Sequence, residues 1–75
     1  MILYSTDLLI DGFVIPYEVG KEGTRLFFKP LKMDNHVDAP IFWVTNIDGI
    51  WEPMNIEDQK FIKQVQDDIL MHEID

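Results

Sequence analysis

Residues 8–15 read LLIDGFVI, and this stretch decides the fold. At its centre stands Asp11-Gly12, a dipeptide that favours a tight two-residue hairpin turn, because both central positions of such a turn need a positive φ. Apolar and β-branched residues flank the pair on both sides, as the two strands of a hairpin require. A second pair of this kind, Asp48-Gly49, also lies between two apolar runs. The chain is therefore expected to be built from antiparallel hairpins.

A two-residue turn at residues 11–12 fixes which side chains share a face of the first hairpin. Alternate residues of a strand point to opposite faces, so a slip of one residue would turn the apolar set outward. In the register with a two-residue turn, one face is apolar almost throughout, and the other is polar except beside the turn. The apolar face pairs Ile10 with Phe13, Leu8 with Ile15, Thr6 with Tyr17 and Tyr4 with Val19, and the other face pairs Leu9 with Val14, Asp7 with Pro16 and Ser5 with Glu18.

Residues 20–23 have glycine at both ends and suggest a four-residue loop into the third strand. This loop keeps the same face apolar across three strands and leaves Phe27 as a large aromatic on the polar side. The predicted pairs are Val19 with Thr24, Tyr17 with Leu26, Ile15 with Phe28, Glu18 with Arg25 and Pro16 with Phe27.

Residues 30–40 form a loop bounded by prolines, longer than the usual connection of about 4 to 6 residues. Its length makes it a candidate binding element. It holds Asp34, His36 and Asp38, whose alternation is compatible with a divalent cation, with His72 as a distant fourth ligand. Three ligands on one flexible segment must be ordered on binding, which costs conformational entropy. We therefore expect turn-forming carboxylates and an exposed imidazole here, and no metal site.

Residues 41–47 and 50–52 are the fourth and fifth strands, with Pro53 ending the pairing because it has no N–H to donate. Both faces of this hairpin are apolar, so the sequence leaves open which one is buried. One face carries Phe42, Val44, Trp51 and Pro53, and the other carries Ile41, Trp43, Ile47, Ile50 and Met54.

The last element is a helix with Asn55 as its N-cap and Asp58 in a position like that of a capping box. Apolar residues recur at helical spacing and form one stripe, which needs a surface to cover. The apolar sheet face is the surface available. The stripe comprises Phe61, Ile62, Val65, Ile69 and His72, and Gln59, Lys63, Gln66, Asp67 and Glu73 point away from the sheet.

These elements predict one α+β domain over residues 1–75: an antiparallel β-meander of four or five strands with one C-terminal α-helix packed on one face. One helix leaves the other face of the sheet open. Phe27-Phe28 and Phe42-Trp43 are consecutive aromatics, so each pair places one ring on the open side. With Pro16, Val14 and Leu9, these rings predict an apolar patch for a second copy or another protein.

The formal charge is -8, from 14 acidic and 6 basic residues, which disfavours nucleic acid and anionic membranes as partners. Half of this charge lies in residues 55–75. Either these acids form a solvated helix face, or they dock on a basic partner. The chain has no cysteine, no apolar signal core at its start and no apolar stretch of about 20 residues, so we expect a cytoplasmic protein.

The residues available for catalysis are few. Ser5 is the only serine, and no glycine-rich phosphate loop occurs, so we expect neither an enzyme nor a cofactor. The leading hypothesis is a non-catalytic interaction module that associates with itself or another protein, with Phe27, Trp43, Pro16 and Val14 at the interface. The alternative is a small acidic inhibitor or nucleic-acid-mimicking decoy, whose Asp67 and Asp68 occupy a basic site on a partner protein. A third is a metal-dependent activity at the 30–40 loop.

Overall fold

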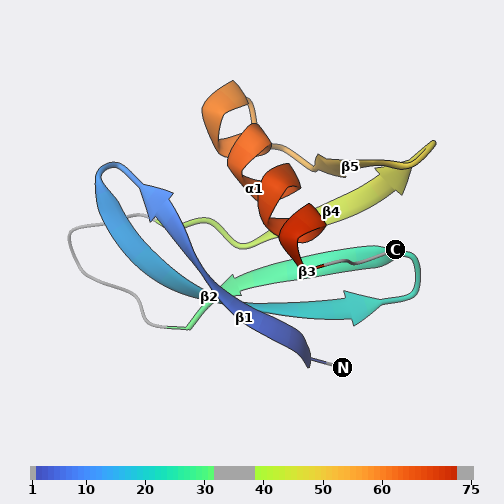
Figure 1. The fold of residues 1–75 in the computed structure, drawn as a ribbon, viewed down its shortest axis with the longest axis horizontal. Helices are drawn as coiled ribbons and strands as arrows, with labels where there is room; N and C mark the ends of the chain where they lie inside the picture. The colour runs from blue at the N-terminus through green and yellow to red at the C-terminus, as the bar shows by residue number, and fades with distance from the viewer. Residues whose placement is uncertain (1, 32–38, 73–75) are drawn as a thin grey trace.

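The structure of the chain, a computed structural model, describes residues 2–31 and 39–72. Five strands form one antiparallel sheet in the order β1-β2-β3-β4-β5, so the predicted α+β meander is confirmed. The sheet is curled, and α1 lies in its hollow (Figure 1). The elements are β1 (Ile2–Ile10), β2 (Phe13–Glu22), β3 (Arg25–Pro30), β4 (Phe42–Ile47), β5 (Ile50–Pro53) and α1 (Gln59–Met71).

The β1–β2 hairpin has the predicted turn and register. Asp11 and Gly12 take positive φ values of 51° and 82°. Leu8 lies opposite Ile15, and the remaining pairs down to Tyr4 with Val19 are those predicted. The turn therefore specifies both the pairing and the buried face of this hairpin.

The predicted four-residue loop between β2 and β3 is wrong. The turn has two residues, with Glu22 opposite Arg25 and Gly23 at φ +63°. Glycine at the first central position suits a type II′ turn, so β2 runs three residues further than expected and Gly20 stays in the strand. As a result, Glu18 faces Lys29 instead of Arg25. The register of β3 against β2 is displaced by four residues, and because this number is even, the side chains predicted for the inner face of β3 stay on that face.

On β4, the face that carries Phe42 and Val44 is buried, and Trp51 of β5 is buried with it. Trp43 is half-buried on the other side of the sheet. Pro53 belongs to β5, opposite Val44, so the predicted end of the strand before Pro53 is one residue short. Proline is accepted here because the N–H of a residue at this position would point to the free edge of the sheet and would not bond β4.

The core lies between α1 and the inner face of the sheet, the face turned toward the helix. Phe28 stacks on Phe42 with ring centroids 4.9 Å apart, and Phe61 of α1 meets Phe42 edge-on at 5.4 Å. Three residues of the predicted helix stripe are buried, namely Phe61, Val65 and Ile69. The buried sheet residues are Leu8, Ile15, Tyr17, Val19, Leu26, Phe28, Pro30, Phe42, Val44 and Trp51.

The helix begins later than predicted. Its N-cap is Asp58, whose Oδ1 accepts hydrogen bonds from the N–H groups of Lys60 at 3.0 Å and Phe61 at 3.4 Å. Asn55, the predicted N-cap, has a φ of 62° and belongs to the preceding turn. Asparagine tolerates this left-handed conformation better than most residues, so Asn55 turns the chain and Asp58 caps the helix.

Two hydrogen bonds hold the ends of the 30–40 loop to β2. The N–H of Leu31 donates to the C=O of Pro16 at 2.8 Å, and the hydroxyl of Tyr17 donates to the C=O of Pro40 at 2.6 Å. Asp34, His36 and Asp38 lie outside the described residues. Within the described ranges, no helix has the length and apolar character needed to cross a membrane.

Candidate functional site

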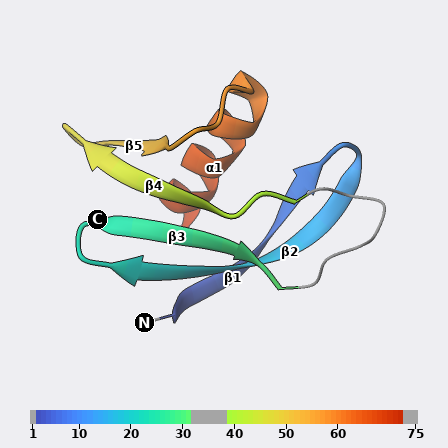
Figure 2. The same cartoon turned by 180° about the vertical axis from the view of Figure 1, so that it is seen from behind.

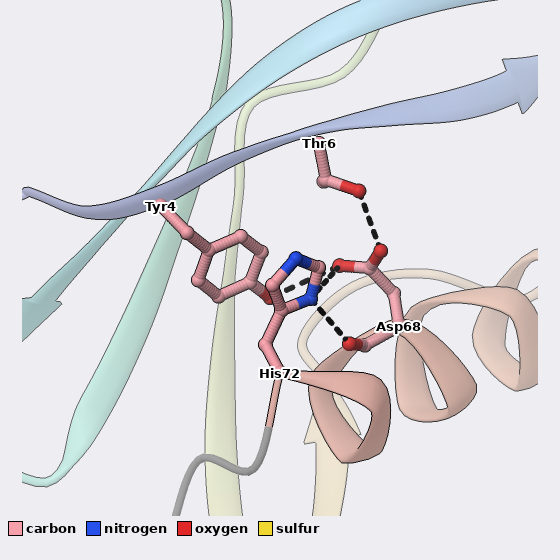
Figure 3. Close-up of polar contacts among 4 residues, drawn as sticks. All are labelled: Tyr4, Thr6, Asp68 and His72. Atoms are coloured by element: carbon pink, nitrogen blue, oxygen red, sulfur yellow. Dashed lines mark hydrogen bonds and ion pairs between the residues drawn. The ribbon is translucent and has the colours of Figure 1, made fainter.

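A polar cluster ties the end of α1 to β1 (Figure 3). The hydroxyl of Tyr4 donates to Oδ2 of Asp68 at 3.0 Å, and the hydroxyl of Thr6 donates to Oδ1 at 2.5 Å. Tyr4 and Thr6 interrupt the apolar face of β1, where a buried hydroxyl needs a partner. Asp68 supplies both acceptors from the facing helix.

His72 completes this cluster. Its ring stacks on Tyr4 with centroids 3.7 Å apart and planes 10° from parallel. Its Nδ1 lies 2.8 Å from the backbone oxygen of Asp68 and 3.9 Å from Oδ2 of the same residue. A carbonyl oxygen only accepts hydrogen bonds, so Nδ1 carries the proton in this contact.

The surroundings of Tyr4 keep its hydroxyl protonated. Burial, the negative charge of Asp68 and the hydrogen bond to that carboxylate together hold the pKa of Tyr4 well above its ordinary value. Because both hydroxyls donate to Asp68, the geometry suits a structural connection between helix and sheet. The Asp68 side chain is only 12% exposed, so Asp68 does not belong to the solvated or docking acidic face considered for residues 55–75. Asp67 is exposed, as predicted.

Two glutamines of α1 reach the free edges of the sheet. The Gln64 Oε1 accepts from the N–H of Leu9 at 2.7 Å, and Nε2 donates to the C=O of the same residue at 3.1 Å. On the opposite edge, Nε2 of Gln66 donates to the C=O of Trp51 at 2.8 Å. The expectation that Gln66 points away from the sheet is therefore wrong. The helix bonds both edge strands and bridges the opening of the curled sheet.

Seen from behind, the sheet lies in front of α1, and no described helix covers this outer face (Figure 2). Phe27 and Trp43 lie directly opposite each other on it, with ring centroids 4.6 Å apart and planes at 46°. Above the Trp43 ring, Cζ of Arg25 is 4.5 Å from the centroid, a cation–π distance. Met54 lies beside Trp43 across the strands, because its N–H donates to the C=O of Trp43 at 2.8 Å.

Alternation along β4 and β5 adds two exposed residues to this side, Ile47 and Ile50, which pair with each other. We call the resulting surface the outer patch. It extends over β3, β4 and β5. Its members are Phe27, Trp43, Ile47, Ile50 and Met54.

The predicted contiguity of Phe27 and Trp43 with Pro16 and Val14 is wrong. Phe27 lies opposite Gly20, which is four residues, or about 13 Å, along β2 from Pro16. The charged pair of Glu18 and Lys29 occupies the space between them. Val14 is 65% exposed beside Leu9 at the far end of the hairpin, so the apolar side chains form two separate surfaces.

No group of three or more metal-ligating side chains occurs in the part of the chain that the structure describes. The predicted loop ligands fall outside it. His72, considered as a distant fourth ligand, is engaged by Tyr4 and Asp68.

Fold and site together define an α+β protein with an antiparallel five-stranded meander, whose two edge strands are bridged by one helix and whose outer face carries an aromatic pair. Comparison with known proteins finds no matching family model, no similar curated protein and no similar solved structure.

Proposed function

We propose that this chain is a non-catalytic protein-interaction module in which two copies associate through the outer patch. The observation that carries the proposal is the pairing of Phe27 with Trp43 under the Arg25 guanidinium, on a side of the sheet that no described helix covers. Tryptophan and arginine are enriched among the residues that contribute most to protein–protein binding. The apolar neighbours around them are about half exposed, with Met54 at 45% and Ile50 at 56%.

The charges around the outer patch support a second copy as the partner. Arg25 lies opposite Glu22 on β2, and Thr45 separates Arg25 from Glu52 on β5. Both signs therefore alternate across one edge of the patch. A twofold axis that passes between Arg25 and one of these glutamates would bring the arginine of each copy near a glutamate of the other, because both copies present the same surface. Such contacts between copies would offset part of the repulsion between two chains that each carry a charge of -8.

The acidic-decoy alternative has less support. The helix Gln59–Met71 carries two aspartates and two lysines, so its own charges balance. One of the aspartates, Asp68, already accepts two hydrogen bonds from β1. Asp67 alone remains as an exposed carboxylate on this helix.

Sedimentation equilibrium of the wild-type chain tests the proposal. We expect a dimer at micromolar concentration, and a shift toward monomer in Trp43→Lys and Phe27→Lys. Removing a central interface residue costs about 2 kcal/mol or more, and a buried ammonium without a partner adds to this cost. Val14→Lys is the matched control, because Val14 is exposed on the same face but lies outside the outer patch. We expect it to leave the dimer intact.

A wild-type chain that stays monomeric at the highest concentration reached would refute self-association. Equal weakening by Val14→Lys would move the interface to the other end of the sheet. Salt separates the proposed dimer from the decoy. Contacts between exposed charges weaken steeply with ionic strength, whereas association through an apolar patch does not.

A further inference from the structure

The free edge of β1 offers unpaired backbone groups along a short stretch. In a hairpin with a two-residue turn, the two residues beside the turn exchange hydrogen bonds with each other. From there, residues whose N–H and C=O point to the partner strand alternate with residues whose N–H and C=O point outward, and the residue next to the hydrogen-bonded one is the first of the outward set. On β1 these outward residues are Leu9, Asp7 and Ser5. Gln64 binds both groups of Leu9, which confirms the outward direction at that position. Among the described residues, no side chain bonds the backbone of Ser5 or Asp7 in the same way.

The two edges of the sheet differ in this respect. On β5 the outward residues are Trp51 and Pro53. Gln66 binds the C=O of Trp51, and Pro53 has no N–H to offer. The edge of β5 therefore offers another strand fewer unpaired groups than β1, which among the described residues keeps both donors and acceptors at Ser5 and Asp7.

A groove runs beside this open stretch of β1. It has a volume of about 420 Å³, within the range typical of ligand-binding clefts, and it lies between Asp7 and Leu8 on one side and α1 on the other. The helix runs antiparallel to β1, because Gln64 meets Leu9 and Asp68 meets Thr6. The open stretch therefore faces the second half of the helix.

The charges along the groove differ between its two ends. Lys60 and Lys63 lie toward the Leu9 end of β1, where Gln64 already covers the edge. Asp67 and Asp68 flank the open stretch, together with Asp7 of β1 itself. A strand that pairs with Ser5 and Asp7 thus passes between carboxylates, and lysine or arginine side chains on it would be stabilised there.

We propose that the edge of β1 at Ser5 and Asp7 binds an extended, lysine- or arginine-containing segment of a partner protein by strand addition. Backbone hydrogen bonds to Ser5 and Asp7 hold the segment, as in other complexes where a peptide extends a sheet. The carboxylates of Asp7 and Asp67 select its charge. This surface is distinct from the outer patch, so the two proposals stand or fall separately.

An amide NMR titration with a short synthetic peptide, in which lysine alternates with valine, tests the site. We expect saturable shifts at the amides of Ser5 and Asp7, and slower hydrogen exchange at both. The decisive variant is Ser5→Pro, because it deletes one outward N–H while leaving the ladder to β2 intact. Losing one hydrogen bond should weaken peptide binding by about two- to tenfold. Ser5→Ala keeps the N–H and should bind like the wild type.

A second variant covers the case that proline disturbs the fold. Asp67→Lys changes an exposed helix position at the groove, and we expect it to weaken the lysine peptide and to strengthen a glutamate–valine peptide. Several results would overturn the proposal: no binding, unchanged affinity in Ser5→Pro and Asp67→Lys, or peptide-induced shifts confined to the outer patch. Shifts at Ser5 and Asp7 that follow protein concentration without peptide would also overturn it, because a second copy would then occupy the edge.

Discussion

The side-chain amide of Gln64 engages the backbone of Leu9 as a neighbouring strand would, accepting its N–H at 2.7 Å and donating to its C=O at 3.1 Å. Gln66, two residues further along the same helix, binds the C=O of Trp51 on the opposite edge strand. Unpaired edges are the usual route by which sheets aggregate. The helix of this protein therefore has two roles: it buries the inner face, and it covers part of both edges.

Gln64→Ala should expose the edge at Leu9. We expect a loss of about 1 to 3 kcal/mol in the free energy of unfolding, since two hydrogen bonds at about 0.5 to 1.5 kcal/mol each disappear. Chemical denaturation measures the loss, and amide exchange at Leu9 should become faster. Gln59→Ala is the control, because Gln59 is exposed at the first helical position. A Gln64→Ala protein as stable as the control, with unchanged exchange at Leu9, would contradict the edge role.

Asp67 and Asp68 should respond differently to substitution. Asp68→Ala leaves the hydroxyls of Tyr4 and Thr6 without their acceptor, and we expect it to cost about 1 to 3 kcal/mol. Asp67→Ala, at an exposed neighbouring position, should stay within about 0.5 kcal/mol of the wild type. A double-mutant cycle with Tyr4→Phe measures the coupling between Tyr4 and Asp68 directly. Additive effects would show that the contact contributes nothing.

The two tyrosines predict a loss of stability at alkaline pH. Burial raises the pKa of Tyr17 to about 12, from about 10 in the unfolded chain. The folded state therefore holds this proton more strongly, and the free energy of unfolding should fall as the pH rises from about 10 through about 12. Tyr4 acts in the same direction. Denaturation at stepwise higher pH measures the fall, and Tyr17→Phe should flatten it. An equally steep fall in Tyr17→Phe would assign the effect to other groups.

The start of the helix can be tested with one pair of substitutions. Asp58→Ala removes the N-cap and should cost about 0.5 to 2 kcal/mol. Asn55→Gly should leave stability nearly unchanged, because its φ of 62° suits glycine and its side chain caps nothing in the described helix. Thermal unfolding compares the two variants. The opposite ranking would restore Asn55 as the cap.

Turn chemistry decided how far the strands could be predicted from the sequence. Asp11-Gly12 allows one register, and the predicted β1–β2 pairing is confirmed. Between β2 and β3, Gly20 and Gly23 both fit a turn, and only the structure shows that Gly20 pairs with Phe27. At β4 both faces are apolar, so periodicity could not distinguish Phe42 from Trp43 as the buried aromatic.

The site residues were harder to predict because their contacts join distant parts of the chain. Phe27 and Trp43 were recognised as candidates, but their pairing depends on a register across the 30–40 loop that no turn signal fixes. The role of Asp68 had one weak signal, the hydroxyls of Tyr4 and Thr6 on an otherwise apolar face. Which helix residue accepts from them depends on how the helix lies across the sheet.

Self-association through the outer patch is the central claim, and isotope-filtered NMR on a mixture of labelled and unlabelled chains tests it most directly. We predict intermolecular contacts from the Trp43 indole and the Phe27 ring of one copy to the outer patch of the other. These contacts should disappear in Trp43→Lys. Intermolecular contacts that involve only Leu9 and Val14, or no contacts to the outer patch at a concentration where sedimentation shows a dimer, would contradict the account. So would a wild type that stays monomeric at the highest concentration reached.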